Sequence, residues 1–309
     1  MTDRSDAPQW HATGLNNGLI VGATYHGVTH LPTWLTYRIG HVGTWLAFHL
    51  MTGGTQALVD NLAVMFPKLD LRERRTLALG TYRSYARDVI DFIRSLRMTT
   101  EATRRLVGRL DTSALDQAMA EGRGAIMLSG HFGNWEIGGV LLRRFTNHAL
   151  SVVARPEASP AVHRLRLEMR ARLGVETIEV RHHLDTALKI RERLTRNEIV
   201  AMLLDRHLGK DFVEVEFFGR PTGFLRTPAL TAALTGAPLV PCFIYREETG
   251  LAVECGPIIR VRSDGDLDAN VRGAVQAFAA QLEAHSRRHP EYWYQFYPVW
   301  PAEPATRLA

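Results

Sequence analysis

The sequence predicts an α/β protein with a mixed, largely parallel central sheet flanked by helices and a helical N-terminal region. Three observations lead to this prediction. Residues 15–97 read as mostly helical, with apolar positions near helical spacing at their end. From about position 124, short apolar runs alternate with helical segments of roughly 10–13 residues, as in parallel strands joined by helices. Near position 247, two apolar runs flank a Glu-Glu-Thr-Gly stretch, which indicates an antiparallel hairpin.

The individual elements follow from the same patterns. Strands are predicted at the short apolar runs: 125–128, 150–154, 177–180, 199–204, 239–246 and 251–255. Helices are predicted where apolar residues recur at three- and four-residue intervals: 84–97, 112–122, 135–144, 161–173, 184–194 and 267–288. In the last of these helices the apolar stripe consists of Val271, Val275, Phe278 and Leu282.

The chain reads as one domain with short tails. We expect a polar tail at 1–14, a single domain over 15–300 and a C-terminal tail at 301–309. Inside the domain, a helical region (15–97) precedes the α/β core (98–300). No repeat and no low-complexity linker divides it.

Composition narrows the function classes. The chain is 46% hydrophobic and 22% charged, which is typical of a globular protein. Its 37 Lys and Arg against 32 Asp and Glu leave a net charge of +5, which suits an anionic lipid, a phosphate or a nucleic acid. No basic-aromatic motif accompanies this charge, so we expect no nucleic-acid partner. The 2 cysteines exclude a disulfide scaffold and a four-thiolate zinc site.

Residues 30–52 form the segment with the strongest membrane character. Three residues interrupt its apolar character: Arg38, His41 and His49. Burying Arg38 in a spanning helix would cost roughly 2.5–3.5 kcal/mol, which favours a helix lying in the membrane interface. Such a helix would place three aromatic side chains near the lipid headgroups: Trp34, Trp45 and Phe48. The alternative is a buried or partner-facing helix of a soluble domain.

The hairpin sets the relation of the two cysteines. If Arg246 pairs with Leu251, then Cys242 lies opposite Cys255. Neighbouring thiols need not form a disulfide. We expect both to be free, structural thiols.

Polar residues follow three of the predicted strands, and they define the candidate site. Open α/β sheets bind ligands beyond the carboxyl ends of their strands. His131 follows the first strand, Arg155 follows the second, and Asp205 with Arg206 follows a later one. We therefore expect these side chains to share one cleft.

The strongest unit is GHFGNWE, residues 130–136. His131 would lie in a strand-to-helix turn, and Glu136 in the first turns of the helix, from which its carboxylate could reach back to the imidazole. A carboxylate on one ring nitrogen fixes the tautomer and leaves the other nitrogen as a base. Asn134 could contact substrate or simply cap the helix. The alternative for His131 is a hydrogen-bonded structural histidine.

No nucleophile accompanies this base. The sequence contains no G-x-S-x-G, HExxH or Walker A motif, and neither cysteine has a catalytic context. A base without a nucleophile fits direct transfer to an acceptor hydroxyl. A metal could be suggested by the cluster of His182, His183 and Asp185. No further ligand distant in the sequence can be identified, so we expect no metal site.

The segment GHFGNWE resembles the His-x4-Asp/Glu motif of the glycerolipid acyltransferase superfamily. More narrowly, it resembles the bacterial lipid A biosynthesis acyltransferases, a group that includes phosphatidylinositol mannoside acyltransferases. Four further segments resemble the same family in the same order: LVDNLAVMFPKLDLRERRTLA (58–78), VVARPEASP (152–160), FFGRPTGFLRTPALTAALTGAPLVPCF (217–243) and HPEYWYQF (289–296).

This resemblance implies transfer of a fatty acyl group from a thioester of acyl carrier protein or coenzyme A to a lipid or glycolipid hydroxyl, with no cofactor. His131 would be the general base and Glu136 would orient and charge it. Arg155 would hold anionic groups or the developing oxyanion, and Asp205 and Arg206 would support the site. The resemblance also implies a place on the cytoplasmic face of the inner membrane.

Two other functions stay open. A hydrolase could use His131 to activate water on a lipid ester or thioester. A non-catalytic relative could merely bind lipid, although the intact His131–Glu136 pair argues against it. Among the supporting residues, Arg155 could be a surface arginine. A row of arginines could be a solvated face or a patch for anionic lipid or an acidic carrier: Arg164, Arg166, Arg170 and Arg172.

Overall fold

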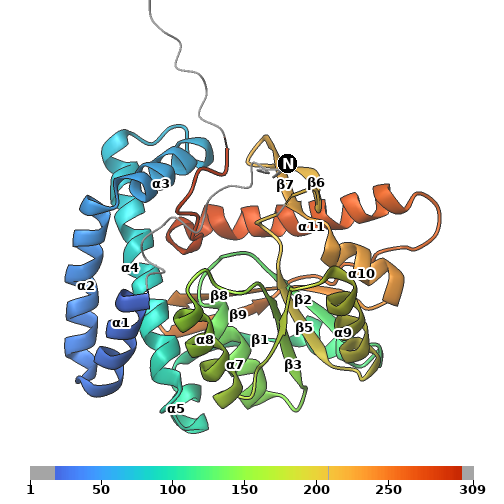
Figure 1. Ribbon diagram of the computed structural model, residues 1–309. Helices are drawn as coiled ribbons and strands as arrows, with labels where there is room; N and C mark the ends of the chain where they lie inside the picture. The colour runs from blue at the N-terminus through green and yellow to red at the C-terminus, as the bar shows by residue number, and fades with distance from the viewer. Residues whose placement is uncertain (1–17, 208, 301–309) are drawn as a thin grey trace, which may run out of the picture.

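A computed structural model describes residues 18–207 and 209–300 (Figure 1). The tails expected at 1–14 and 301–309 lie outside the described residues. The N-terminal region is helical, as predicted, and consists of four helices: α1 (Gly18–His30), α2 (Thr33–Leu50), α3 (Thr52–Met65) and α4 (Leu71–Ser95). Asp70 and Glu73 form a reciprocal capping box that starts α4. The 25-residue α4 then packs against the other three helices and against the C-terminal segment, residues 289–300, through the short 3-10 helix Pro290–Tyr292.

The central sheet has seven strands in the order β1-β9-β8-β2-β5-β3-β4. Their bounds are β1 (Val107–Asp111), β2 (Ala125–Ser129), β3 (Leu150–Ala154), β4 (Glu176–Glu179), β5 (Ile199–Leu203), β8 (Leu239–Glu247) and β9 (Gly250–Cys255). All neighbours are parallel except β8 and β9. The mixed, largely parallel sheet is therefore confirmed.

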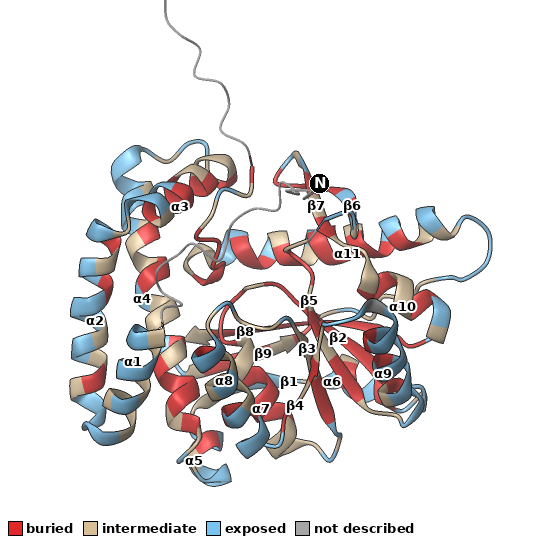
Figure 2. Cartoon of the chain, in the orientation of Figure 1, coloured by how far each residue is buried: buried red, intermediate tan, exposed pale blue. Residues whose placement is uncertain are grey.

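Helices cover the sheet, and a small hairpin lies outside it. The helices of this part are α5 (Thr100–Arg104), α6 (Ser113–Met119), α7 (Trp135–Phe145), α8 (Pro160–Arg172), α9 (His183–Thr195), α10 (Thr227–Thr235) and α11 (Leu267–Arg288). The hairpin consists of β6 (Phe212–Phe217) and β7 (Arg220–Leu225) and packs against α11. Figure 2 shows the buried residues concentrated in the sheet and on the inner faces of the helices.

Two strand regions were not predicted. β1 is an edge strand in which four of five residues are exposed, so it carries no apolar run. β6 alternates exposed and buried residues along Phe-Val-Glu-Val-Glu-Phe, and this period of two was a usable signal.

The hairpin register is the predicted one, with Arg246 opposite Leu251 and Cys242 opposite Cys255. The expectation of free thiols was wrong, because the structure joins the two cysteines by a disulfide. Their Cα atoms are 4.2 Å apart. Directly opposite positions on antiparallel strands bring two side chains into contact, and here that contact is between the sulfurs.

The aromatic residues of α2 divide between surface and core. Trp34 is 62% exposed and Trp45 is 50% exposed. Phe48 is only 5% exposed and packs edge-on against Tyr82 of α4, so the expectation that it lies near headgroups was wrong. The helical period places it on the inner face. Within the described residues, none of the helices combines the length and hydrophobicity that crossing a membrane requires.

Candidate active site

The loop between β2 and α7 is held against β8 and the C-terminal segment by its backbone. Gly133 donates its N–H to the carbonyl of Tyr292 at 2.8 Å, and Asn134 donates to the carbonyl of Ile244 at 2.9 Å. Gly133 has a φ of 58°, and a Cβ at this position would lie 1.7 Å from the Ile244 oxygen. Only glycine fits here, and its positive φ sets the backbone conformation of the loop that carries His131.

His131 pairs with Asp205 at the ends of two neighbouring parallel strands, β2 and β5. The His131 ring nitrogen Nδ1 lies 2.8 Å from Asp205 Oδ1, and the His131 backbone N–H donates to Oδ2 at 2.8 Å. Oδ2 also accepts from Trp293 Nε1 at 3.0 Å and from Gln295 Nε2 at 2.6 Å. The Asp205 side chain is completely buried, so these donors fix its orientation.

The electrostatics of the pair favour a neutral imidazole beside an ionised carboxylate. Burial lowers the pKa of His131, and the positive charge of Arg206 lowers it further, while Asp205 acts to raise it. Burial acts to raise the pKa of Asp205, but the charge and hydrogen bonds of His131 and the charge of Arg206 hold it below its usual value. A neutral ring with Nδ1–H directed at Asp205 leaves Nε2 with a free electron pair.

Nε2 of His131 is available to a ligand. Among residues 18–207 and 209–300 no hydrogen-bonding group engages it, and 18% of the side chain is exposed. The ring packs edge-on against Trp135, with ring centroids 5.3 Å apart. An acceptor hydroxyl beside Trp135 could therefore approach this nitrogen.

Glu136 does not contact the imidazole. Its two oxygens accept from Arg170 Nε at 3.0 Å and Nη2 at 2.5 Å, and Arg166 Nη1 lies 3.7 Å away. Burial acts to raise the pKa of Glu136, but the charges of Arg170 and Arg166 hold it below its usual value. The carboxylate partner of His131 is thus Asp205 in place of the expected Glu136, because the first turn of α7 directs Glu136 toward α8.

Of the two readings of this row of arginines, the solvated face is wrong for Arg166 and Arg170. Arg164 and Arg172 are exposed, but Arg170 is only 8% exposed and Arg166 is half-buried, on the inner side of α8. The four-residue spacing of 166 and 170, continued by the apolar Leu173, was the available signal. Arg166 also pairs with Glu157 at 3.3 Å.

Two expected substrate contacts are occupied within the protein. Asn134 accepts from the N–H of Ile137 at 3.1 Å and donates to the Asp88 carbonyl at 3.1 Å, so its side chain caps α7. Arg206 donates to Gln295 Oε1 at 3.0 Å and to the carbonyl of Tyr294 at 2.7 Å. Arg206 therefore anchors the C-terminal segment beside Asp205.

Arg155 lies at the end of β3, two strands from β2, on the same edge of the sheet. It is exposed and makes no hydrogen bond or ion pair with the described residues, so its charge is open to an anionic ligand. Within the described part of the chain, no group of three or more His, Cys, Asp or Glu side chains is arranged to hold a metal ion.

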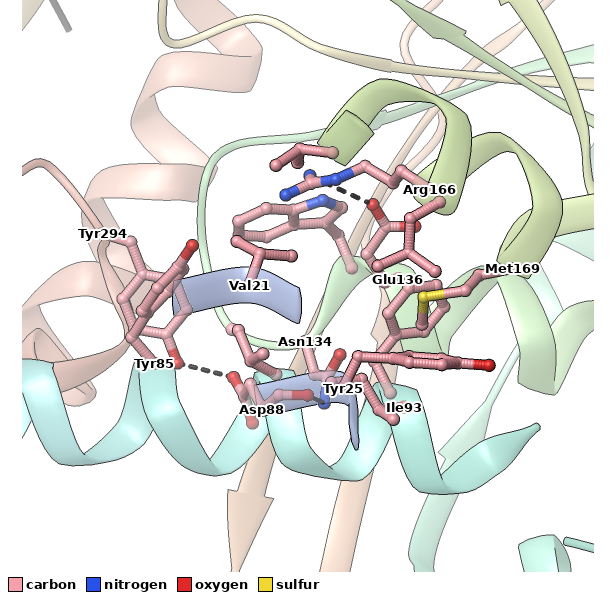
Figure 3. A pocket seen from close by; sticks show the side chains of 16 residues that line it. Val21, Tyr25, Tyr85, Asp88, Ile93, Asn134, Glu136, Arg166, Met169 and Tyr294 are labelled. Carbon is pink, nitrogen blue, oxygen red and sulfur yellow. Dashed lines mark hydrogen bonds and ion pairs between the residues drawn. The ribbon is translucent and has the colours of Figure 1, made fainter. Parts of the chain in front are cut away.

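An apolar pocket adjoins the His131 loop (Figure 3). Residues of the loop and of the first turn of α7 line it: Gly133, Asn134, Trp135 and Glu136. The remaining wall comes from α1, α4, α8 and the C-terminal segment: Val21, Tyr25, Tyr85, Asp88, Val89, Phe92, Ile93, Val162, Leu165, Arg166, Met169 and Tyr294. Trp135 therefore separates the candidate base from a mostly hydrocarbon-lined space.

The chain is similar to known proteins over most of its length. The family profile described as "Bacterial lipid A biosynthesis acyltransferase" matches residues 10–301. A phosphatidylinositol mannoside acyltransferase of Mycobacterium tuberculosis is 30% identical over 260 residues, covering 81% of this chain and 78% of the relative. One of Mycolicibacterium smegmatis is 28% identical over 267 residues, covering 85% of each. The chain is an acyltransferase and belongs to the bacterial lipid A biosynthesis acyltransferase family.

Proposed function

We propose that this protein transfers a fatty acyl group from a thioester of acyl carrier protein or coenzyme A to a hydroxyl of a glycolipid, with His131 as the general base. The observation that carries the proposal is the His131–Asp205 pair, with its buried carboxylate and free Nε2, on a loop that lines an apolar pocket. The mycobacterial relatives, named for a mannoside of phosphatidylinositol, support a glycolipid acceptor.

The chemical step uses only groups that the chain and its substrates supply. Nε2 of His131 takes the proton from the acceptor hydroxyl while that oxygen attacks the thioester carbonyl. The tetrahedral intermediate then expels the thiolate, which takes the proton back from His131 and leaves as a thiol. The products are an ester and a free thiol, and no metal or cofactor takes part. Such base catalysis typically contributes roughly 10²–10⁴-fold.

Asp205 and Glu136 play different parts in this proposal. Asp205 holds the tautomer and stabilises the imidazolium that forms when His131 accepts the proton. Glu136 is a positioning residue, because its carboxylate binds Arg170 and so ties the first turn of α7 to α8. Arg155, with its open charge, binds an anionic group of the donor or acceptor.

The pocket holds the acyl chain. Its wall is built mainly from aliphatic and aromatic side chains, and burial of methylene groups there is favourable by about 0.8 kcal/mol each. Trp135 lines the pocket and packs edge-on against His131, so the carbonyl end of a bound chain would have to pass this side chain to reach the base.

The N-terminal helices bind the membrane surface. Apolar side chains on α1, on α2 and in the turn between them are exposed: Leu19, Ile20, Leu31, Trp34, Ile39, Val42, Trp45, Leu46 and Leu50. Figure 1 shows α2 as the outermost helix at one end of the molecule. An exposed apolar patch that includes two tryptophans is typical of an interfacial helix. This patch would bring the site to its lipid acceptor.

Product mass spectrometry tests the transfer. Purified protein is mixed with acyl-CoA and acyl carrier protein donors and with a lipid extract from its host. A lipid heavier by one acyl group, formed by the wild type and absent with folded His131→Ala, is expected. Free fatty acid without a heavier lipid would indicate a hydrolase, and transfer by folded His131→Ala would refute the assigned base.

A further inference from the structure

Asp88 is a polar exception in the wall of the apolar pocket. It lies on α4, between Tyr85 and Val89 of the pocket wall, and is only 7% exposed. Its carboxylate oxygen Oδ2 accepts a hydrogen bond from Tyr294 at 2.5 Å (Figure 3). Its backbone carbonyl accepts from Asn134, so the residue is anchored from two sides.

The second carboxylate oxygen, Oδ1, is unused. No donor among residues 18–207 and 209–300 hydrogen-bonds to it. The atom is not fully buried, and Asp88 is one of the residues that line the pocket, so a ligand there lies within reach of this side chain. Buried polar groups normally find a partner, which makes an open oxygen in a hydrocarbon-lined wall a feature that needs a ligand.

We propose that Asp88 hydrogen-bonds to a hydroxyl group on the acyl chain, so that the protein prefers hydroxylated acyl donors. This inference rests on the proposed function, in which the pocket holds the acyl chain. A plain methylene against Asp88 would displace water and leave Oδ1 without a partner. A hydroxyl at the same depth would give Oδ1 a hydrogen-bond partner, and the rest of the chain would still be buried.

The protonation state of Asp88 is compatible with such a contact. Burial raises its pKa to about 7; the Tyr294 hydroxyl opposes this rise, and the charge of Asp91 adds to it. The charges of Arg246 and Arg87 act in the lowering direction. In either form the carboxyl group can bind a hydroxyl, as acceptor when ionised and as donor when protonated.

The test compares an unsubstituted tetradecanoyl donor with three donors that each carry one hydroxyl. The hydroxyl lies near the thioester, in mid-chain or near the methyl end. With wild-type protein, kcat/KM for one hydroxylated donor should exceed that of the unsubstituted donor at least about tenfold. Asp88→Leu should reduce this ratio to about one, whereas Asp88→Asn, which keeps an oxygen in place, should retain part of it. Ile93→Leu, a pocket change without a polar atom, is the matched control and should keep the ratio.

The outcomes separate this inference from the proposed function. His131-dependent transfer with no preference for any hydroxylated donor overturns the role of Asp88, whatever the variants do, and leaves the transferase standing. A preference that survives in folded Asp88→Leu also overturns it. If no donor is transferred, calorimetric binding of the free hydroxylated and plain tetradecanoic acids to His131→Ala decides. Tenfold tighter binding of a hydroxylated acid supports the role of Asp88, and equal binding refutes it.

Discussion

Asp205 determines which nitrogen of His131 keeps a free electron pair. Its Oδ1 lies 2.8 Å from Nδ1, and three further donors hold its other oxygen. The negative charge also acts to raise the pKa of His131 against the effects of burial and Arg206. One buried carboxylate therefore controls both the orientation and the basicity of the imidazole.

For this residue we predict that Asp205→Asn lowers kcat by at least about 100-fold, because the side chain no longer holds the proton of the His131 ring on Nδ1. Removing the negative charge also lowers the pKa of His131, so the acid limb of the kcat/KM profile should move to lower pH. The measurement is a pH–rate profile of the transfer reaction. Glu136→Gln is the control and should leave the acid limb in place, since Glu136 does not contact the ring. A shift with Glu136→Gln and none with Asp205→Asn would reverse the two assignments.

Among the elements, the turn from β2 into α7 carries the strictest constraint. The turn is clamped to β8 by Asn134 and to the C-terminal segment by Gly133. The Glu136–Arg170 pair then ties α7 to α8. The loop that carries His131 thus depends on three other elements for its shape: β8, α8 and the C-terminal segment.

We predict that Gly133→Ala lowers the free energy of unfolding by about 2–4 kcal/mol, because the new Cβ would meet the Ile244 oxygen and the backbone would be strained. Chemical denaturation measures this change. Gly273→Ala in α11 is the matched control. It has nothing within 4 Å of a Cβ, so the helix should gain about 0.5–1 kcal/mol. Equal effects of the two substitutions would contradict the account of the turn.

For the molecule as a whole, the exposed apolar side chains of α1 and α2 gather at one end, which is the end that we propose faces lipid. Other exposed leucines occur on the opposite side, with Leu184 of α9 at 72% and Leu234 of α10 at 71% exposure (Figure 1). Exposure alone therefore does not identify a membrane face. What distinguishes α2 is two exposed tryptophans on one helix with several aliphatic residues.

We predict that the double variant Trp34→Ala/Trp45→Ala binds vesicles of anionic phospholipid at least about tenfold more weakly than the wild type, because it buries less apolar area. Vesicle flotation measures the partition. Leu184→Ala/Leu234→Ala removes exposed apolar groups elsewhere and should bind as the wild type does. Equal losses in both double variants, or no vesicle binding by the wild type, would remove α2 as the docking helix.

The sequence by itself determined the class of fold and the position of the candidate base. β3 and α11 have the predicted bounds, 150–154 and 267–288. A short apolar run marks a buried strand, and apolar residues at three- and four-residue intervals mark an amphipathic helix. The hairpin register was also predictable, since one pair of opposite residues in an antiparallel hairpin fixes every other pair. His131 was identifiable because the carboxyl end of a buried strand is where such folds bind ligands.

Only the tertiary structure decided which carboxylate His131 uses. Glu136 is five positions away along the chain, but the start of α7 directs it to Arg170. Asp205 is 74 positions away and becomes the neighbour of His131 because β5 lies beside β2 in the sheet. The pocket and its open carboxylate on Asp88 arose in the same way, from packing of α1, α4 and α8. Local pattern specifies an element and its buried face, whereas strand order and helix packing, which depend on distant contacts, specify which side chains meet.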